Sequence, residues 1–176
     1  HGINDLRSFY IKNKTPINIF ADSTTSKYLK KSFSYCFDRY NREYPATLKL
    51  NSIKKKLFIK TSKRNIKITP ITVRHGNVNS ICYIIDNKIA YISDVSEIFK
   101  KDFRYFRNLK YLIIDCLWYK NHPSHFNLKK SLEMIDIFLP KKAILTNLHT
   151  DIDYDEIKKL LPKNVIPAYD GLTVSL

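Results

Sequence analysis

The alternation of apolar and polar positions along this chain predicts strands and helices in turn. Runs that alternate in polarity or form a short apolar block predict strands at 16–21, 57–60, 66–73, 81–85, 89–92, 111–114 and 143–145. Apolar stripes at helical spacing predict helices at about 24–40 and 128–138, and Asp153 can cap a third helix that ends at Leu161. Residues 86–88 predict a hairpin turn, and residues 169–171 predict a turn into a last strand.

The order of these elements predicts an α+β fold. Hairpins come first and strands alternate with helices later, which indicates a mixed sheet covered by helices. The 176 residues show no repeat, low-complexity tract or linker, so we expect one domain over 1–176. A hydrophobic content of 44% excludes a disordered chain. No apolar stretch approaches the roughly 20 residues of a membrane span.

Three polar side chains stand at the far ends of strand-like runs. His75 follows the run that ends at Arg74, Asp94 follows Ser93, and His149 follows Leu148. Imidazole and carboxylate groups on rigid strand ends suit a divalent metal, so these residues are candidate ligands. A plainer interpretation of each one also stands: either histidine can be a hydrogen-bonded loop residue, and Asp94 can cap a helix that begins near 95–96.

The charge and the cysteine content bear on possible partners and on the cellular compartment, but they do not decide the function. A net charge of +15 attracts anions of any size, including nucleic acid, but the lysines are spread along the chain as on ordinary solvated faces. Cys36, Cys82 and Cys116 form an odd, scattered set with no C-x-x-C spacing. Such a set is typical of the reducing cytoplasm, where we expect this protein.

Several short motifs, taken in order, resemble one enzyme family. They are His75-Gly76, Ser93-Asp94, His122-Pro-Ser-His125-Phe126, Thr146-Asn-Leu-His149 and Ala168-Tyr-Asp-Gly171. Together they resemble the metallo-β-lactamase superfamily, and within it the phosphodiesterase branch that includes tRNA 3′-processing ribonucleases and phosphoribosyl cyclic phosphodiesterases. The cyclic phosphodiesterases are the closer match. The segment that opens with Gly2 is also similar to the one that follows their first ligand motif.

This resemblance implies a fold, a cofactor and a role for each site residue. The fold would be the αββα four-layer sandwich, with two divalent ions, Zn²⁺ or Mn²⁺, that activate water for phosphodiester hydrolysis. His75 and His149 would each bind one ion, and Asp94 would bridge both. His125 would donate a proton to the leaving oxygen or contact the phosphoryl group. Asn147 stands where many members carry the ligand histidine, although the phosphodiesterase pattern places the ligand at His149.

Two neighbouring residues keep open interpretations. His122 can form an exposed histidine pair with His125 ahead of the helix, or it can share in the chemistry. Asp115 ends a buried strand, where it can orient a ligand imidazole or be a satisfied strand-end carboxylate.

The family's other metal ligands belong to a His-x-His-x-Asp-His run, followed by two residues and a glycine. Aligned on Gly2, that run would end two residues before His1, so we expect a fragment without the first strands and the first metal motif. As written, the chain is expected to bind metal poorly and to be inactive.

The expected substrate is a small anionic phosphodiester, such as a cyclic phosphate. The stretch 39–65 is too short for the arm with which the family's ribonucleases hold tRNA. A tRNA 3′-processing-like nuclease and a non-catalytic remnant of the fold are the alternatives. A nucleic-acid partner is less favoured, a membrane partner is not expected, and a homodimer stays open.

Overall fold

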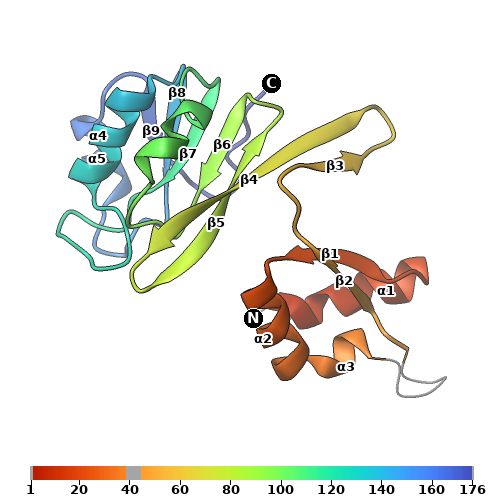
Figure 1. Ribbon diagram of the computed structural model, residues 1–176. Helices are drawn as coiled ribbons and strands as arrows, with labels where there is room; N and C mark the ends of the chain where they lie inside the picture. The colour runs from red at the N-terminus through yellow and green to blue at the C-terminus, as the bar shows by residue number, and fades with distance from the viewer. Residues whose placement is uncertain (1, 39–44, 176) are drawn as a thin grey trace. The chain divides into compact units, whose positions relative to one another are not determined.

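The computed structural model describes residues 2–38 and 45–175, which form two compact units, His1–Lys54 and Lys55–Leu176 (Figure 1). The organisation of residues 1–176 as one domain stays a prediction.

The first unit contains a short parallel strand pair and several helical turns. Its elements are η1 (Gly2–Leu6), α1 (Arg7–Asn13), β1 (Ile17–Ala21), α2 (Ser23–Ser32), α3 (Ser34–Phe37) and β2 (Leu48–Ser52). β1 and β2 pair in parallel, with Ile17 opposite Leu48. The side chain of Asp22 caps α2 by accepting hydrogen bonds from the backbone N–H groups of Thr24 and Thr25, at 2.8 and 2.9 Å.

The predicted continuous helix at 24–40 is wrong. α2 ends at Ser32, and Phe33 leaves the helical conformation with φ −135° before α3 begins. The ring of Phe33 lies edge-on to Tyr28 and Tyr35, at centroid distances of 6.5 and 6.4 Å, so aromatic packing accompanies the break. The last two predicted helical residues, 39 and 40, lie outside the described residues.

The strands of the second unit form one seven-stranded sheet within residues 55–175, in the order β3-β4-β5-β6-β7-β8-β9. The strands are β3 (Leu57–Lys60), β4 (Asn65–His75), β5 (Val78–Ile85), β6 (Ile89–Ile92), β7 (Tyr111–Asp115), β8 (Lys142–Thr146) and β9 (Val165–Pro167). Neighbours from β3 to β6 are antiparallel, and neighbours from β6 to β9 are parallel. The mixed sheet predicted from the sequence is therefore confirmed.

Helices cover one face of this sheet (Figure 1). They are η2 (Lys100–Tyr105), α4 (Leu128–Phe138) and α5 (Tyr154–Leu160). α4 turns Met134, Ile135 and Phe138 into the main apolar core, where they join buried strand residues such as Val73 and Ile114. The rings of Phe106 and Phe138 stack there at 5.3 Å. The helical stripe predicted at 128–138 is α4, and the helix capped by Asp153 is α5.

The strand predicted after residues 169–171 is wrong. The last strand is β9, which precedes that turn, and the described residues 172–175 form no strand. The tail is held by a side chain instead, because the hydroxyl of Tyr111 donates to the carbonyl of Ser175 at 2.8 Å.

The direction of the strands gathers the candidate site residues at one edge. β4 is antiparallel to β5, which is antiparallel to β6, so β4 points the same way as β6, β7 and β8. The carboxyl ends of these four strands therefore lie at the same edge of the sheet. His75 and Asp115 end β4 and β7, while Asp94 and Asn147 follow β6 and β8.

The three cysteines are buried and free. Burial raises the pKa of both Cys82 and Cys116 to about 12, so these thiols stay protonated. Among the described residues, no helix is long and apolar enough to pass through a membrane. Cytoplasmic localisation stays a prediction.

Candidate metal centre

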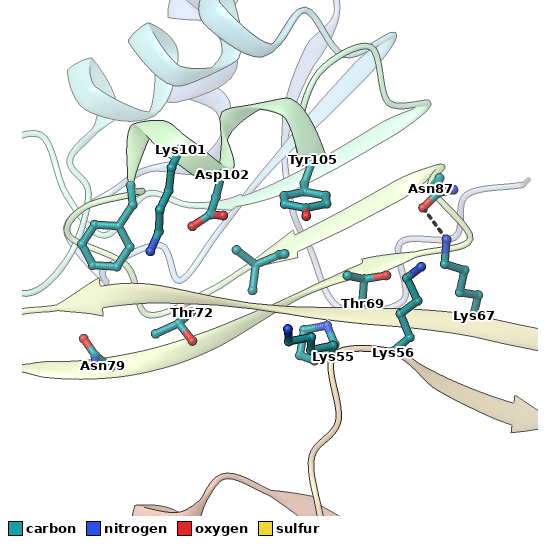
Figure 2. A pocket seen from close by; sticks show the side chains of 13 residues that line it. Lys55, Lys56, Lys67, Thr69, Thr72, Asn79, Asn87, Lys101, Asp102 and Tyr105 are labelled. Atoms are coloured by element: carbon teal, nitrogen blue, oxygen red, sulfur yellow. Dashed lines mark hydrogen bonds between the residues drawn. The ribbon is translucent and has the colours of Figure 1, made fainter.

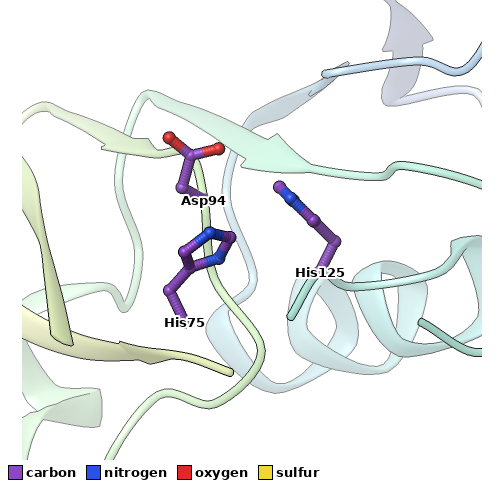
Figure 3. A group of neighbouring side chains, drawn as sticks. All are labelled: His75, Asp94 and His125. Carbon is purple, nitrogen blue, oxygen red and sulfur yellow. The ribbon is translucent and has the colours of Figure 1, made fainter. Parts of the chain in front are cut away.

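His75, Asp94 and His125 meet at the carboxyl edge of the sheet (Figure 3). Each offers a ligand atom, and these atoms all lie within 4.8 Å of one another. The rings of His75 and His125 stand edge-on, 4.7 Å apart between centroids and inclined by 77°. Two imidazoles and a carboxylate form the donor set of many divalent metal sites.

His75 is held in one tautomer by the backbone. Its Nδ1 lies 2.7 Å from the carbonyl oxygen of Ser124. A carbonyl can only accept, so Nδ1 must carry the hydrogen and Nε2 is left with its lone pair when the ring is neutral. His75 is therefore prepared to bind a cation through Nε2.

Gly76 allows this close approach. Its φ is +58°, a conformation that glycine adopts at little cost, and it forms the tight turn between β4 and β5. A Cβ at this position would lie only 3.0 Å from the Cβ of Ser124. The absence of a side chain at Gly76 thus lets the Ser124 backbone reach His75.

Asp94 leaves β6 through a left-handed turn, with φ +56°. Aspartate is among the few non-glycine residues that tolerate this conformation. The hydroxyl of Ser80 donates to the carbonyl of Asp94 at 2.7 Å and helps to fix the turn. The side chain is exposed, so its carboxylate is available to a ligand.

His125 is oriented by a carboxylate. Its Nδ1 lies 2.7 Å from Oδ2 of Asp115, and the Asp115 side chain is fully buried. The same oxygen accepts from the backbone N–H of Val95 at 3.0 Å. Because a carboxylate accepts these bonds, Nδ1 of His125 carries the hydrogen and Nε2 faces away from Asp115. Asp115 therefore orients the imidazole of His125.

Asn147 joins the two carboxylates. Its Nδ2 lies 2.9 Å from Oγ of Ser93, 3.1 Å from Oδ1 of Asp115 and 3.4 Å from Oδ1 of Asp94. The φ of Asn147 is +61°, which turns the chain back toward the site directly after β8. The sequence marked Asn147 only as a residue standing in a ligand position. The structure brings its amide to the cluster.

His149 lies outside the group formed by His75, Asp94 and His125. Its ring packs beside Trp118 at 5.3 Å between centroids, and its Nδ1 accepts from the backbone N–H of Asp151 at 3.2 Å. Its assignment as a metal ligand stays a prediction. His122 flanks the site: its ring centroid lies 5.3 Å from that of His125, and its Nδ1 lies 3.2 Å from Oγ of Ser124.

The family described as "Beta-lactamase superfamily domain" matches residues 1–147. Among solved structures, a diphosphatase of the PhnP family aligns with a TM-score of 0.84 and 25% identity, over 99% of this chain. Only 66% of the diphosphatase is covered, so this chain spans just under two thirds of its length.

Two further structures share the fold at lower identity. Zn(2+)-bound PqqB from Methylobacterium extorquens has a TM-score of 0.71 and 11% identity, covering 99% of this chain and 69% of that one. The short form of human tRNase Z has a TM-score of 0.59 and 12% identity, covering 93% of this chain and 68% of that one. No curated protein matches the sequence significantly.

Proposed function

The chain belongs to the beta-lactamase superfamily domain family, and from that premise we propose that it is a metal-dependent hydrolase of phosphodiesters. The metallo-β-lactamase fold predicted from the sequence is confirmed by the family match and by the diphosphatase structure. The observation that carries the proposal is the convergence of His75, Asp94 and His125 within 4.8 Å. The diphosphatase, 25% identical, supports a substrate with a phosphoryl group.

The donor set fits a divalent cation. Both imidazoles carry their hydrogen on Nδ1, so each can present Nε2, and Asp94 adds an exposed carboxylate. The carboxylate of Asp115 is buried behind His125, and a buried negative charge favours a nearby cation. Nitrogen and oxygen donors together suit Zn²⁺ or Mn²⁺. The thiol of the adjacent Cys116 contributes no ligand, because burial raises its pKa to about 12.

Within this group we assign His75 and Asp94 to the metal, and we assign His125, which can present Nε2 to a metal or to a substrate, to the substrate. A bound divalent ion supplies a Lewis acid for the phosphoryl group and favours ionisation of a water molecule. A second ion, shared through Asp94 and bound by His149, rests on the resemblance alone. The number and identity of the ions belong to the proposal.

His125 is suited to donate a proton to the leaving oxygen. When its ring is protonated, the hydrogen on Nδ1 stays with Asp115, and the hydrogen on Nε2 points away from that carboxylate. Transfer of the Nε2 proton leaves a neutral imidazole that is still bound to Asp115, so the ring keeps its orientation between turnovers. Nε2 then takes up a proton from water, which restores the protonated ring for the next turnover.

The substrate class is tested by metal-dependent turnover. Cyclic phosphates, other small phosphodiesters and an RNA with a 3′ extension are compared after metal removal and after reloading with Zn²⁺ or Mn²⁺. The assays use residues 1–176 and, separately, the same chain with whatever its gene encodes upstream. We expect the activity to favour the small substrates over the RNA.

Two outcomes would change this proposal. Preferred cleavage of the RNA would favour the nuclease alternative, which the fold likeness to human tRNase Z supports. A folded, metal-loaded gene product that hydrolyses none of these substrates would show that the fold is kept here without the chemistry.

A further inference from the structure

A lysine-lined groove lies along β4 in the second unit (Figure 2), and its lining does not include His75, Asp94 or His125. Its volume is about 850 Å³. Four lysines line it: Lys55, Lys56, Lys67 and Lys101. We call this feature the lysine groove.

The lysine groove follows the open edge of β4. β3 pairs with β4 only as far as Ile68, and Arg74 is next bridged to Glu97. Between them, residues 69–73 have no strand partner on that side in the part of the chain that is described. From Lys67 to Thr72 the groove spans five strand steps, or about 17 Å. A ligand in it would be extended.

The groove carries an excess of positive charge. Asp102 is the only acidic residue among the described residues that line it. Lys67 is held toward the groove by Asn87, whose Oδ1 lies 3.3 Å from its Nζ (Figure 2). Four ammonium groups opposite one carboxylate favour a ligand with several negative charges over a single anion.

Aromatic rings stand among these cations. Phe99 and Tyr105 line the same groove, and Nζ of Lys101 lies 5.6 Å from the centroid of the Phe99 ring. Proteins that bind single strands combine a cationic track for the phosphates with aromatic side chains for the bases. A strongly acidic peptide would satisfy the charges but would leave the rings without a flat partner.

The edge itself is poorly suited to a peptide. Pro70 lies in the middle of the open segment and has no N–H to offer a further strand. From these observations we propose that the lysine groove binds a single strand of RNA or DNA, with the lysines on the phosphates and Phe99 and Tyr105 beside the bases.

This binding site is distinct from the metal centre. Asn79 lines one end of the groove and pairs with Arg74, next to His75, but none of His75, Asp94 and His125 lines the groove. Binding of a strand in the lysine groove does not depend on the proposed hydrolysis.

The test is a titration of the protein against a fluorescein-labelled oligouridine, followed by anisotropy. Lys67→Glu/Lys101→Glu is compared with Lys158→Glu/Lys163→Glu, a matched pair of exposed lysines outside the groove that changes the net charge equally. We expect the groove double variant to bind the oligouridine at least about tenfold more weakly. The slope of the logarithm of the binding constant against the logarithm of the salt concentration should become shallower by about one or more, since phosphate contacts are lost. The control pair should change the dissociation constant by less than about twofold.

A second variant guards against misfolding and probes the bases. Lys101 is exposed on η2, so Lys101→Glu alone should fold normally and still weaken binding. Tyr105→Leu should weaken the binding of oligouridine. The affinity of the groove for polyphosphate, which has no bases, should stay the same. If both double variants lost the same affinity for oligouridine, net charge alone would explain the effect, and the proposal would be overturned. Competition by polyglutamate as strong as that by an unlabelled oligonucleotide would overturn it as well.

Discussion

The buried carboxylate of Asp115 and the partly exposed imidazole of His125 form a pair, with Oδ2 and Nδ1 2.7 Å apart. The pair joins the end of β7 to the loop that precedes α4. The backbone N–H of Val95 and the amide of Asn147 also donate hydrogen bonds to this carboxylate, so Asp115 is held in place independently of His125. The direction of the His125 ring is thus set by the sheet.

Replacing Asp115 tests this relationship. In Asp115→Asn the amide cannot accept from all the donors that surround it, so His125 should lose its orientation. We expect kcat to fall by about 10²–10⁴-fold, and unfolding to require about 1–3 kcal/mol less free energy. Turnover and chemical denaturation are measured beside Asp136→Asn, an exposed aspartate on α4. Unchanged kcat in Asp115→Asn would show that the pair has no role in the reaction.

His125→Ala separates proton donation from metal binding. Loss of a general acid should lower kcat by about 10²–10⁴-fold on an ester with a poor leaving group. On a p-nitrophenyl ester the defect should shrink, because p-nitrophenolate needs little protonation. Metal content by atomic emission should stay unchanged. Loss of metal would make His125 a third ligand beside His75 and Asp94.

His149→Ala tests the predicted second metal site. If His149 and the bridging Asp94 bind the same second ion, the variant should lose one metal per chain and most of its activity. Asp151→Asn, which removes the charged partner 3.5 Å from Nδ1 of His149, should have a smaller effect. Full metal occupancy in His149→Ala would remove this residue from the ligand set.

Asp94 contributes both charge and backbone conformation. Asparagine also tolerates a φ of +56°, so Asp94→Asn should keep the fold while it weakens metal affinity. Alanine lacks this tolerance, and Asp94→Ala should lower the free energy of unfolding by a further 1–2 kcal/mol or so. Metal titration and thermal unfolding of both variants separate the two contributions. Full metal occupancy in either variant would contradict the ligand assignment.

Gly76→Ala should disturb His75 from outside the metal centre. The added Cβ would lie 3.0 Å from the Cβ of Ser124, and the alanine would have to adopt a φ of +58°. We expect a loss of stability of about 1–2 kcal/mol and weaker metal binding, because the Ser124 carbonyl is pushed from His75. Ser124→Gly in the same chain should restore part of the metal affinity by removing the clash. No recovery in the double variant would leave backbone strain as the whole effect.

The cap of α2 gives a pH dependence. The backbone hydrogen bond from Thr25 is the largest cause that holds the pKa of Asp22 below its usual value. Its stabilisation is therefore fully present above the unfolded-state pKa and is lost as the pH falls through the lower folded-state pKa. Asp22→Asn keeps a neutral cap, so the far-ultraviolet circular dichroism of the variant should lose less helical signal on acidification than that of the unchanged protein. Identical acid profiles would contradict the prediction.

The sequence was sufficient for elements whose pattern reflects burial. Successive side chains of β7 and β8 are buried, so their continuous apolar runs marked them as strands. The site edge followed from polar residues at strand ends, and His75 and Asp94 do converge. The broken helix at Phe33 could not be anticipated, because the apolar stripe continues through the break.

Contacts between loops were also beyond the sequence. The bond from His125 to Asp115 and the position of Asn147 depend on strand order, which hydrophobic periodicity does not contain. β2 was missed for a related reason: only Leu48 and Leu50 mark it, and its partner β1 lies far away along the chain. A polar residue directly after a buried strand was nonetheless a usable signal for both Asp115 and Asn147.

The position of β7 between two parallel neighbours bears on how the site opens. Its amides are bonded within the sheet on both sides, so they should be among the slowest to exchange with deuterium. The loops that carry Gly76 and Ser124 lack such neighbours and should open far more often. Brief excursions of the loop that carries His125 would then open the site while His75 and Asp115 stay in the sheet. Exchange of the metal would proceed without unfolding the sheet.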